Sequence, residues 1–124
     1  MPSRAVWYKK GSIILFEVSD PLTIDDLETG AEEVWALATE VREPVDMIFD
    51  YAKVTDFPRG VLPIVREHFT LPTLDRVALV GGEPLIEMMI ITITRATFRP
   101  DPTIHETVED AADALRRLAE DGNR

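Results

Sequence analysis

Three short apolar segments, each followed by a helical pattern, limit the folds open to this chain more than any other feature. They are Ile13–Val18, Val45–Phe49 and Asp75–Val80. Strands that form nearly continuous apolar runs are typical of sheets covered on both faces. Strands that alternate with helices predict a mostly parallel sheet with helices packed against it. The chain is therefore expected to fold as an α/β protein.

The predicted order of elements is β-β-α-β-α-β-α-β-α, in a single domain over residues 1–124. Gly11–Ser12 is a turn pair between Val6–Lys10 and Ile13–Val18, which predicts a hairpin and makes the sheet mixed. Caps and breakers predict the other elements: a helix opened by Thr23 with Asp26, a helix over Arg59–Phe69 after Pro58, a helix after Glu83–Pro84, a short strand Ala96–Arg99, and a last helix with a Thr103–Glu106 capping box.

Apolar residues at helical spacing predict which faces of these helices are buried, because residues three and four apart share one face. The predicted inner faces are Leu27, Ala31, Val34, Trp35, Ala38 and Val41 in the first helix, Leu62, Val65 and Phe69 in the second, and Ile104, Val108, Ala111, Ala112, Leu115 and Leu118 in the last.

The acidic balance and the lack of cysteine exclude several classes of protein. The chain carries 13 Lys and Arg against 23 Asp and Glu, a net charge of −10, and no cysteine. Binding to nucleic acid or to an anionic membrane needs clustered cations, which this sequence lacks. Disulfides and thiolate metal sites need cysteine. The longest apolar run, Leu85–Ile93, is too short to span a bilayer, and no secretory signal is present, so a cytoplasmic location is expected.

The candidate binding site is the stretch Val45–Gly60, a buried strand followed by a polar loop and a helix start. Right-handed crossovers place the loops Ser19–Leu22, Tyr51–Pro58 and Gly81–Glu83 at the same end of the sheet. Ligands of α/β proteins bind beyond the carboxyl ends of the strands. The candidate binding residues are therefore Asp50, Lys53, Thr55, Asp56 and Arg59.

The carboxylates at this end of the sheet allow two interpretations. Asp50 and Asp56, with Asp20 and Glu83, supply the oxygen ligands that Mg²⁺ prefers. Asp in loops more often accepts hydrogen bonds from nearby backbone N–H groups, and that structural role is favoured. No metal or cofactor is predicted.

The helix that follows Pro84 is apolar on two sides. Ile86, Met89, Ile90 and Ile93 share one side and are the candidate interface residues, and Leu85 and Met88 occupy another. A helix that is apolar on two sides is either deeply buried or contacts a second surface. Self-association, as a homodimer, or a partner protein is the functional alternative to burial.

Two further features, a glycine pair and two histidines, do not predict a phosphate-binding, catalytic or metal site. Gly81–Gly82 lies between a strand and a helix, but it lacks the spacing of a phosphate-binding loop, and Glu83 would repel an anion. His68 and His105 each adjoin a Glu, but neither has a ligand partner at i+4 or a recognisable nucleophile, so surface roles are expected.

The segments MIFDYAKVTDFPRG, DRVALVGG and TIHETVEDAADALRRL, in this order of elements, resemble STAS domains, in particular SpoIIAA-like bacterial proteins of the anti-sigma-factor antagonist fold. The resemblance implies a SpoIIAA-like sheet and a regulatory role. Members of this family carry a phosphorylatable Ser or Thr ahead of the second helix. Alignment on Val54 and Gly60 places Pro58 and Arg59 where the acid and the hydroxyl would stand, so no matching acceptor is present; Thr55 lies several residues earlier.

The leading hypothesis is a non-enzymatic regulatory or adaptor module that acts by protein–protein interaction. The alternative is a small-molecule or lipid-binding protein with a pocket at the carboxyl-terminal end of the sheet. An Mg²⁺-dependent enzyme that uses Asp50 and Asp56 is a third hypothesis, for which the sequence contains no completed motif.

Overall fold

The elements of the chain follow the predicted order of strands and helices. The structure is a computed structural model that describes residues 3–68, 74–97 and 101–122. The elements are β1 (Ser3–Lys9), β2 (Ile13–Ser19), α1 (Ile24–Ala38), β3 (Val45–Lys53), α2 (Val61–His68), β4 (Leu74–Val80), α3 (Pro84–Thr97), β5 (Thr103–His105) and α4 (Val108–Gly122).

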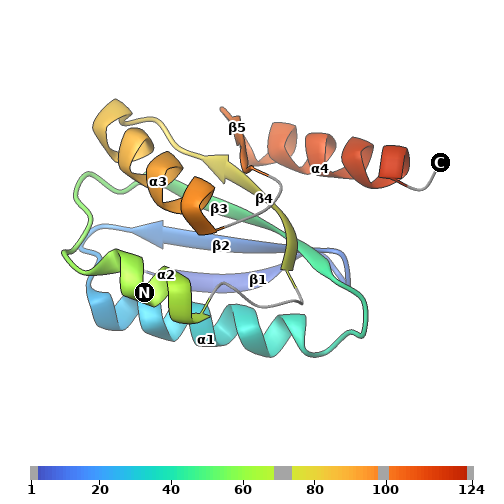
Figure 1. Cartoon of the computed structure of the whole chain (residues 1–124), viewed down its shortest axis with the longest axis horizontal. Helices are drawn as coiled ribbons and strands as arrows, with labels where there is room; N and C mark the ends of the chain where they lie inside the picture. The colour runs from blue at the N-terminus through green and yellow to red at the C-terminus, as the bar shows by residue number, and fades with distance from the viewer. Residues whose placement is uncertain (1–2, 69–73, 98–100, 123–124) are drawn as a thin grey trace.

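The strands form one five-stranded sheet in the order β1-β2-β3-β4-β5 (Figure 1). β1 is antiparallel to β2, because the two are joined by the predicted hairpin, and every other neighbouring pair is parallel. The prediction of a mixed, mostly parallel sheet is therefore confirmed. Each parallel pair is joined through a helix, as a crossover between parallel strands requires.

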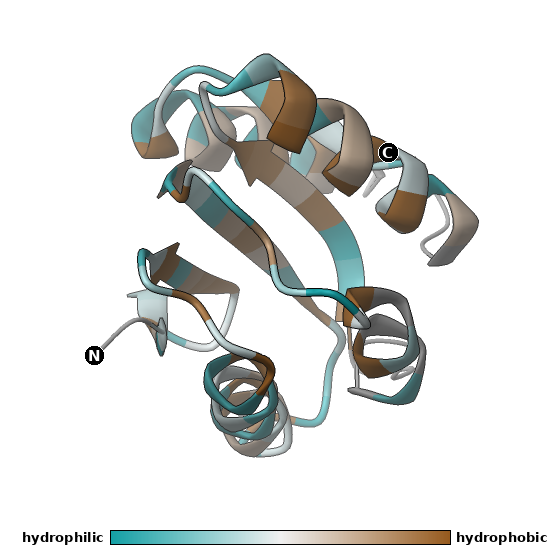
Figure 2. Cartoon of the chain, turned by 90° about the vertical axis from the view of Figure 1, so that its left-hand side faces the viewer, coloured by the Kyte–Doolittle hydropathy of each residue, from teal (hydrophilic) through white to brown (hydrophobic). Residues whose placement is uncertain are grey.

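Two apolar layers lie on opposite faces of the sheet. α1, α2 and α3 cover one face, where side chains such as Phe16, Met47 and Phe49 are buried. α4 covers the other face and packs on Ile48 and Ala78. Figure 2 shows the strands coloured mostly as hydrophobic, whereas the outer surface of α1, at the bottom of the view, is hydrophilic. β3 is central, and its burial on both faces explains its continuous apolar sequence.

α1 begins as predicted and ends earlier. Thr23 and Asp26 form the capping box, and the inner face buries Leu27, Ala31, Val34 and Ala38. Trp35 was predicted on this face but is 51% exposed. At 100° per residue it lies on the flank of the stripe, so the sheet does not cover it. Val41 lies beyond the helix, which ends at Ala38 rather than at Glu43–Pro44.

α2 begins at Val61, two residues later than predicted. Gly60 has a φ of +86°, a left-handed conformation that interrupts the helix and suits glycine. Val61 and Ile64 are buried. The predicted inner residues Leu62, Val65 and Phe69 lie outside the described side chains.

α3 confirms the helix predicted after Glu83–Pro84 and continues through Thr97. Its threonines fit the helix because Thr92 and Thr94 donate their hydroxyls to the carbonyls of Met88 and Ile90, at 2.9 and 2.8 Å. The strand predicted over Ala96–Arg99 is wrong at Ala96 and Thr97, which belong to α3, and Phe98 and Arg99 lie outside the described residues.

The start of the last helix was predicted wrongly. Thr103–His105 forms β5, which pairs with β4, so Thr103 is not a helix cap. Thr107 accepts a hydrogen bond from the N–H of Asp110 at 3.1 Å and is the cap of α4. Of the predicted inner residues, Ala111, Ala112 and Leu115 are buried and Val108 is partly buried, whereas Ile104 and Leu118 are exposed. Within the described ranges, no helix is both long and apolar enough to cross a membrane.

Candidate functional site

The loop that carries the candidate site covers residues 54–60, because β3 continues to Lys53, and it is held to the core at two points. Val54 and Phe57 are buried, and the Phe57 ring lies edge-on to Phe49 with ring centres 6.4 Å apart. The N–H of Val54 donates to the carbonyl of Tyr51 at 3.0 Å, which turns the chain as β3 ends. The polar residues between these anchors therefore stay at the carboxyl end of the sheet.

Thr55 is bound to the neighbouring loop. Its hydroxyl donates to Oδ2 of Asp20 at 2.6 Å, and its N–H donates to the same carboxylate at 3.0 Å. The loops after β2 and β3 therefore meet at one end of the sheet, as predicted. Asp20 acts as the hydrogen-bond acceptor of this junction, which is the structural role favoured for loop carboxylates.

Asp50 and Lys53 lie apart from Thr55, in a polar groove of about 390 Å³ that they share with Arg4 and Glu17. β3 runs to Lys53, so Asp50 lies within the strand, paired with Glu17 of β2 and Val80 of β4. Arg4 forms an ion pair with Glu17 at 2.6 Å. Oδ1 of Asp50 accepts the N–H of Ala52 at 3.0 Å. The groove therefore presents side chains of both charges on the sheet face on which α4 packs.

The five predicted binding residues do not form one cluster. Asp50 and Lys53 line the groove, Thr55 is bound to Asp20, and Asp56 and Arg59 are exposed in the loop. No group of three or more metal-ligating side chains is found among the described residues. The Mg²⁺ hypothesis therefore has no assembled ligand set in this part of the chain.

The inner and outer faces of α3 have different environments. Ile86 and Ile90, predicted as interface residues, are 7% and 3% exposed and belong to the core, as does the partly buried Ile93. Ile86 and Ile90 are therefore buried in the core and do not form an exposed surface. Leu85 and Met88 are 74% and 66% exposed, and Met89, the remaining predicted interface residue, is 37% exposed.

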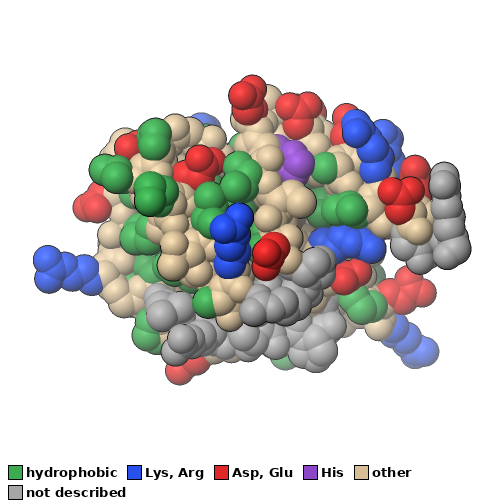
Figure 3. Space-filling view, turned by 45° about the horizontal axis from the view of Figure 1, so that its top comes forward, with side chains coloured by type: hydrophobic (Ala, Val, Ile, Leu, Met, Phe, Trp, Pro, Cys, Tyr) green, Lys and Arg blue, Asp and Glu red, His purple; other side chains and the backbone are tan. Residues whose placement is uncertain are grey.

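Leu85, Met88 and Met89, hereafter the outer row of α3, form one strip because residues three and four apart are neighbours on a helix. Figure 3 shows hydrophobic side chains gathered over this part of the surface, with acidic side chains beside them. The sequence contained this signal, since the helix was apolar on two sides, but it did not show which side faces the sheet.

The junction between β4 and α3 is filled by Tyr51. A Cβ on Gly81 would lie 2.0 Å from Cε2 of the Tyr51 ring, so glycine is required there by close approach. Glu83 caps α3 by accepting the N–H of Ile86 at 3.0 Å. The carboxylate of Glu83 therefore occupies the N-terminus of α3, where a phosphate would otherwise bind. The role of Gly81 in this turn is to leave room for the Tyr51 ring.

The hydroxyl of Tyr51 is buried without a hydrogen-bond partner among the described residues. Burial, and secondarily the negative charge of Glu87, raises the pKa of Tyr51 to about 12. Tyr51 was missed in the sequence because an aromatic residue at the end of a strand gives no sign of what its hydroxyl faces.

His105 lies in β5 rather than in a helix, and its Nε2 is 2.8 Å from the hydroxyl of Thr103. Burial lowers the pKa of His105, and Asp110 opposes this effect. The side chain of His68 lies outside the described ones. Among the described residues, His105 thus contacts a hydroxyl within its own strand and belongs to no group of metal-ligating side chains.

Comparison with solved structures identifies the class of fold. An uncharacterized protein of the DUF3478 family with a SpoIIAA-like fold, from Shewanella loihica PV-4, matches with a TM-score of 0.66 and 18% identity over 91% of each chain. An anti-sigma factor antagonist from Mycobacterium paratuberculosis matches with a TM-score of 0.62 and 18% identity over 92% of each chain. No protein-family model and no curated protein sequence matches the chain. The chain therefore has a SpoIIAA-like fold, as the resemblance of its sequence implied.

Proposed function

We propose that the chain is a non-enzymatic regulatory or adaptor module that acts by protein–protein interaction, with the outer row of α3 as its docking surface. The observation that carries this proposal is the exposure of Leu85, Met88 and Met89 on one strip of one helix. The likeness of the fold to an anti-sigma factor antagonist supports a regulatory role through protein partners.

The outer row suits a partner that inserts apolar side chains. Single exposed hydrophobic residues are ordinary on a protein surface, whereas a contiguous apolar strip marks an interaction site. Methionine side chains are flexible and polarizable, and they fit partner surfaces of different shapes. An apolar helix strip of this kind docks into a complementary groove.

The charge of the chain favours a partner of another sequence over a second copy. With a net charge of −10, two copies repel each other, whereas a cationic partner is attracted. The partner that fits is therefore a protein that carries an apolar groove with Lys or Arg around it.

Docking in this proposal does not depend on phosphorylation of the loop before α2. The residues ahead of Gly60 are Pro58 and Arg59, neither of which has a hydroxyl, and the hydroxyl of Thr55 donates to Asp20. A phosphate found on Thr55 in the native host would contradict this part of the proposal.

The alternative function, a ligand pocket at the carboxyl-terminal end of the sheet, is less well supported. The groove there is lined by Arg4, Glu17, Asp50 and Lys53, and it suits a polar or charged molecule rather than a lipid. Its charged side chains are solvent-accessible, so they gain little from pairing with a ligand.

The proposal is tested by site-specific photo-cross-linking in the native host. A photoreactive residue in place of Met88 is expected to cross-link the chain to one discrete protein of another sequence. The control position is Glu109, which is exposed on α4 on the other side of the sheet. Cross-links of equal yield from both positions would contradict docking through α3. A cross-linked dimer of the chain, matched by a dimer in light scattering, would overturn the choice of a different partner.

A further inference from the structure

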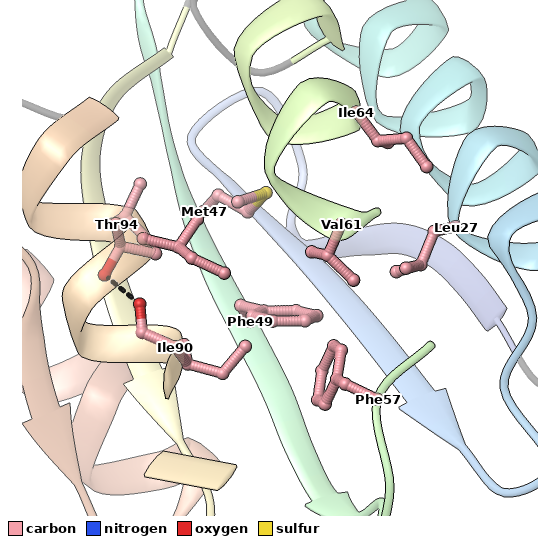
Figure 4. A pocket seen from close by; sticks show the side chains of 10 residues that line it. Leu27, Met47, Phe49, Phe57, Val61, Ile64, Ile90 and Thr94 are labelled. Atoms are coloured by element: carbon pink, nitrogen blue, oxygen red, sulfur yellow. Dashed lines mark hydrogen bonds between the residues drawn. The ribbon is translucent and has the colours of Figure 1, made fainter. Parts of the chain in front are cut away.

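An apolar cavity of about 40 Å³ lies between the sheet and the helices α2 and α3 (Figure 4). Met47 and Phe49 of β3 line it on the side of the sheet, and Ile90 lines it on the side of α3. A cavity of about 150 Å³ holds a benzene molecule, so this one has room for about one or two carbon atoms. It is a packing gap in the core, and the backbone groups open to a partner lie instead at the edge of the sheet.

β1 is an edge strand, and β2 is its pairing partner in the part of the chain that the structure describes (Figure 1). Among the described residues, no hydrogen bond joins the backbone of residues 3–8 to any element other than β2. Pairing on one side uses alternate N–H and C=O groups of a strand, so the others point away from the sheet. β1 therefore presents an outward row of backbone donors and acceptors along its seven residues.

The two faces of β1 have different neighbours. Ser3 and Ala5 are buried on the side of α1, where the hydroxyl of Ser3 donates to the carbonyl of Asp26 at 2.7 Å. Arg4 and Val6 alternate with them and lie on the opposite face, because successive side chains of a strand point to opposite sides. Arg4 is exposed there. A strand added beside β1 would therefore continue this face and place its own side chains next to Arg4 and Val6.

β1 and the turn that follows it are the cationic part of an acidic chain. Residues 3–16 include Arg4, Lys9 and Lys10 and no Asp or Glu, whereas the whole chain has a net charge of −10. All three cations are exposed. Arg4 pairs with Glu17 of β2, whereas Lys9 and Lys10 form no ion pair with a described residue. The charge of this edge therefore favours a partner segment that carries negative charge.

A second copy of the chain does not suit this edge. Two β1 strands paired over their full length, in either direction, would bring the cations of one copy beside those of the other, and like charges across a strand pair are destabilising. Edge strands use Lys and bulges in this way against self-pairing, and β1 has a register shift between Trp7 and Lys9. The occupant that fits is therefore a segment of another sequence.

We propose that the free edge of β1 binds an extended acidic segment of a partner protein, which adds to the sheet as a further strand. Its main-chain groups pair with those of β1, and its carboxylates lie beside Arg4, Lys9 and Lys10. The main-chain hydrogen bonds supply most of the affinity, because each exposed charge pair contributes little. The charges select the sign of the segment that binds. This site is separate from the outer row of α3, whose proposed partner carries Lys or Arg.

The test is a titration of the whole chain with a capped peptide of alternating Glu and Val, about as long as β1, followed by NMR of the backbone amides. Saturable shifts and slower hydrogen exchange are expected in β1, and none in β5, the strand at the opposite edge. A peptide with Lys in place of Glu is expected not to bind. A peptide with Pro in place of Val keeps the charge but is also expected not to bind, because Pro has no N–H to donate to a ladder.

A pair of variants separates the charge of this edge from the charge of the whole chain. Lys9→Glu/Lys10→Glu is expected to weaken binding of the Glu–Val peptide by about tenfold or more, since the peptide then meets like charges. Arg59→Glu/Arg117→Glu makes the same change in net charge at exposed positions outside β1 and its hairpin, and it is expected to bind within about twofold of the wild type. All four positions are exposed, so both variants are expected to fold.

Four results would overturn the proposal: no saturable binding of the Glu–Val peptide, equal binding of the Lys–Val or Glu–Pro peptide, equal affinity of the two charge variants, or protection of the β1 amides without peptide in a chain that light scattering shows to be a dimer. The last result would mean that a second copy occupies the edge. These outcomes leave the docking role of the outer row untouched, because Leu85 and Met88 belong to α3 and not to β1.

Discussion

The two apolar faces of α3 are alike in composition and opposite in environment. The inner face, with Ile86, Ile90 and Thr94, is buried against the sheet, and the outer row, with Leu85, Met88 and Met89, is exposed. The difference teaches that an apolar sequence on a helix does not by itself identify the core. The face that the neighbouring strands cover becomes part of the core, and the opposite apolar face stays exposed to solvent.

The largest expected difference between these faces is in stability. Ile90→Ala is expected to lower the free energy of unfolding by about 2–5 kcal/mol, since it removes buried carbons and enlarges the adjacent cavity. Met88→Ala, on the outer face, is expected to change it by about 0.5 kcal/mol or less. Urea unfolding monitored by circular dichroism measures both values. Equal losses from the two substitutions would show that the faces are not distinct.

The packing beneath the start of α3 is expected to make stability depend on alkaline pH. Burial and the charge of Glu87 raise the pKa of Tyr51 from 10.0 to about 12. Above pH 10 the unfolded chain releases the Tyr51 proton first, so the fold loses stability as the pH rises toward 12, by up to about 1.4 kcal/mol per pH unit. Tyr51→Phe is expected to remove this loss, whereas Tyr8→Phe, at an exposed position, is expected to retain it.

At neutral pH the same substitution tests the hydroxyl alone. Tyr51→Phe removes a buried group that has no partner among the described residues, so it is expected to be neutral or slightly stabilising. A marked loss of stability at pH 7 would show that the hydroxyl has a hydrogen-bond partner.

Gly81 and Gly82, at the junction before α3, provide a smaller test with a matched control. Gly81→Ala is expected to destabilise the fold by about 1–3 kcal/mol, because its Cβ meets the Tyr51 ring. A Cβ on Gly82 would have no atom within 4 Å, so Gly82→Ala is expected to be neutral or mildly stabilising. Thermal unfolding of the two variants separates these outcomes, and a well-tolerated Gly81→Ala would argue against close packing under α3.

The smallest effect on stability is expected in the outer row itself. Leu85→Ser combined with Met88→Ser is expected to leave the free energy of unfolding within about 0.5 kcal/mol of the wild type, since exposed side chains far from any buried contact contribute little. Chemical unfolding measures this. A loss of several kcal/mol would mean that α3 is covered by another part of the same chain and has no free docking face.

Local signals in the sequence were enough for most of the fold. The hairpin at Gly11–Ser12, the Thr23–Asp26 capping box and the apolar run of β3 each depend on neighbouring residues, and each was predicted. The hairpin register also pairs Arg4 with Glu17, so this ion pair at the polar groove could have been predicted from the hairpin.

The prediction was wrong where contacts between residues distant in the sequence determine the structure. Thr103 and Thr107 each have a carboxylate three residues later, and the edge of β4 is what draws Thr103 into a strand. Trp35 is apolar and follows the helical spacing of the core residues, but it lies on the flank of α1 that the sheet does not cover. The contact of Tyr51 with Gly81, like the cavity between α2 and α3, arises from side chains brought together by the complete fold.

A competition experiment tests the central claim most directly. The cross-link formed from position 88 is measured while unlabelled protein is added, either as wild type or as the Leu85→Glu/Met88→Glu variant, after circular dichroism has shown that the variant is folded. We expect the wild type to abolish the cross-link and the variant to leave it intact. A folded variant that competes as well as the wild type would show that the outer row of α3 is not where the partner binds.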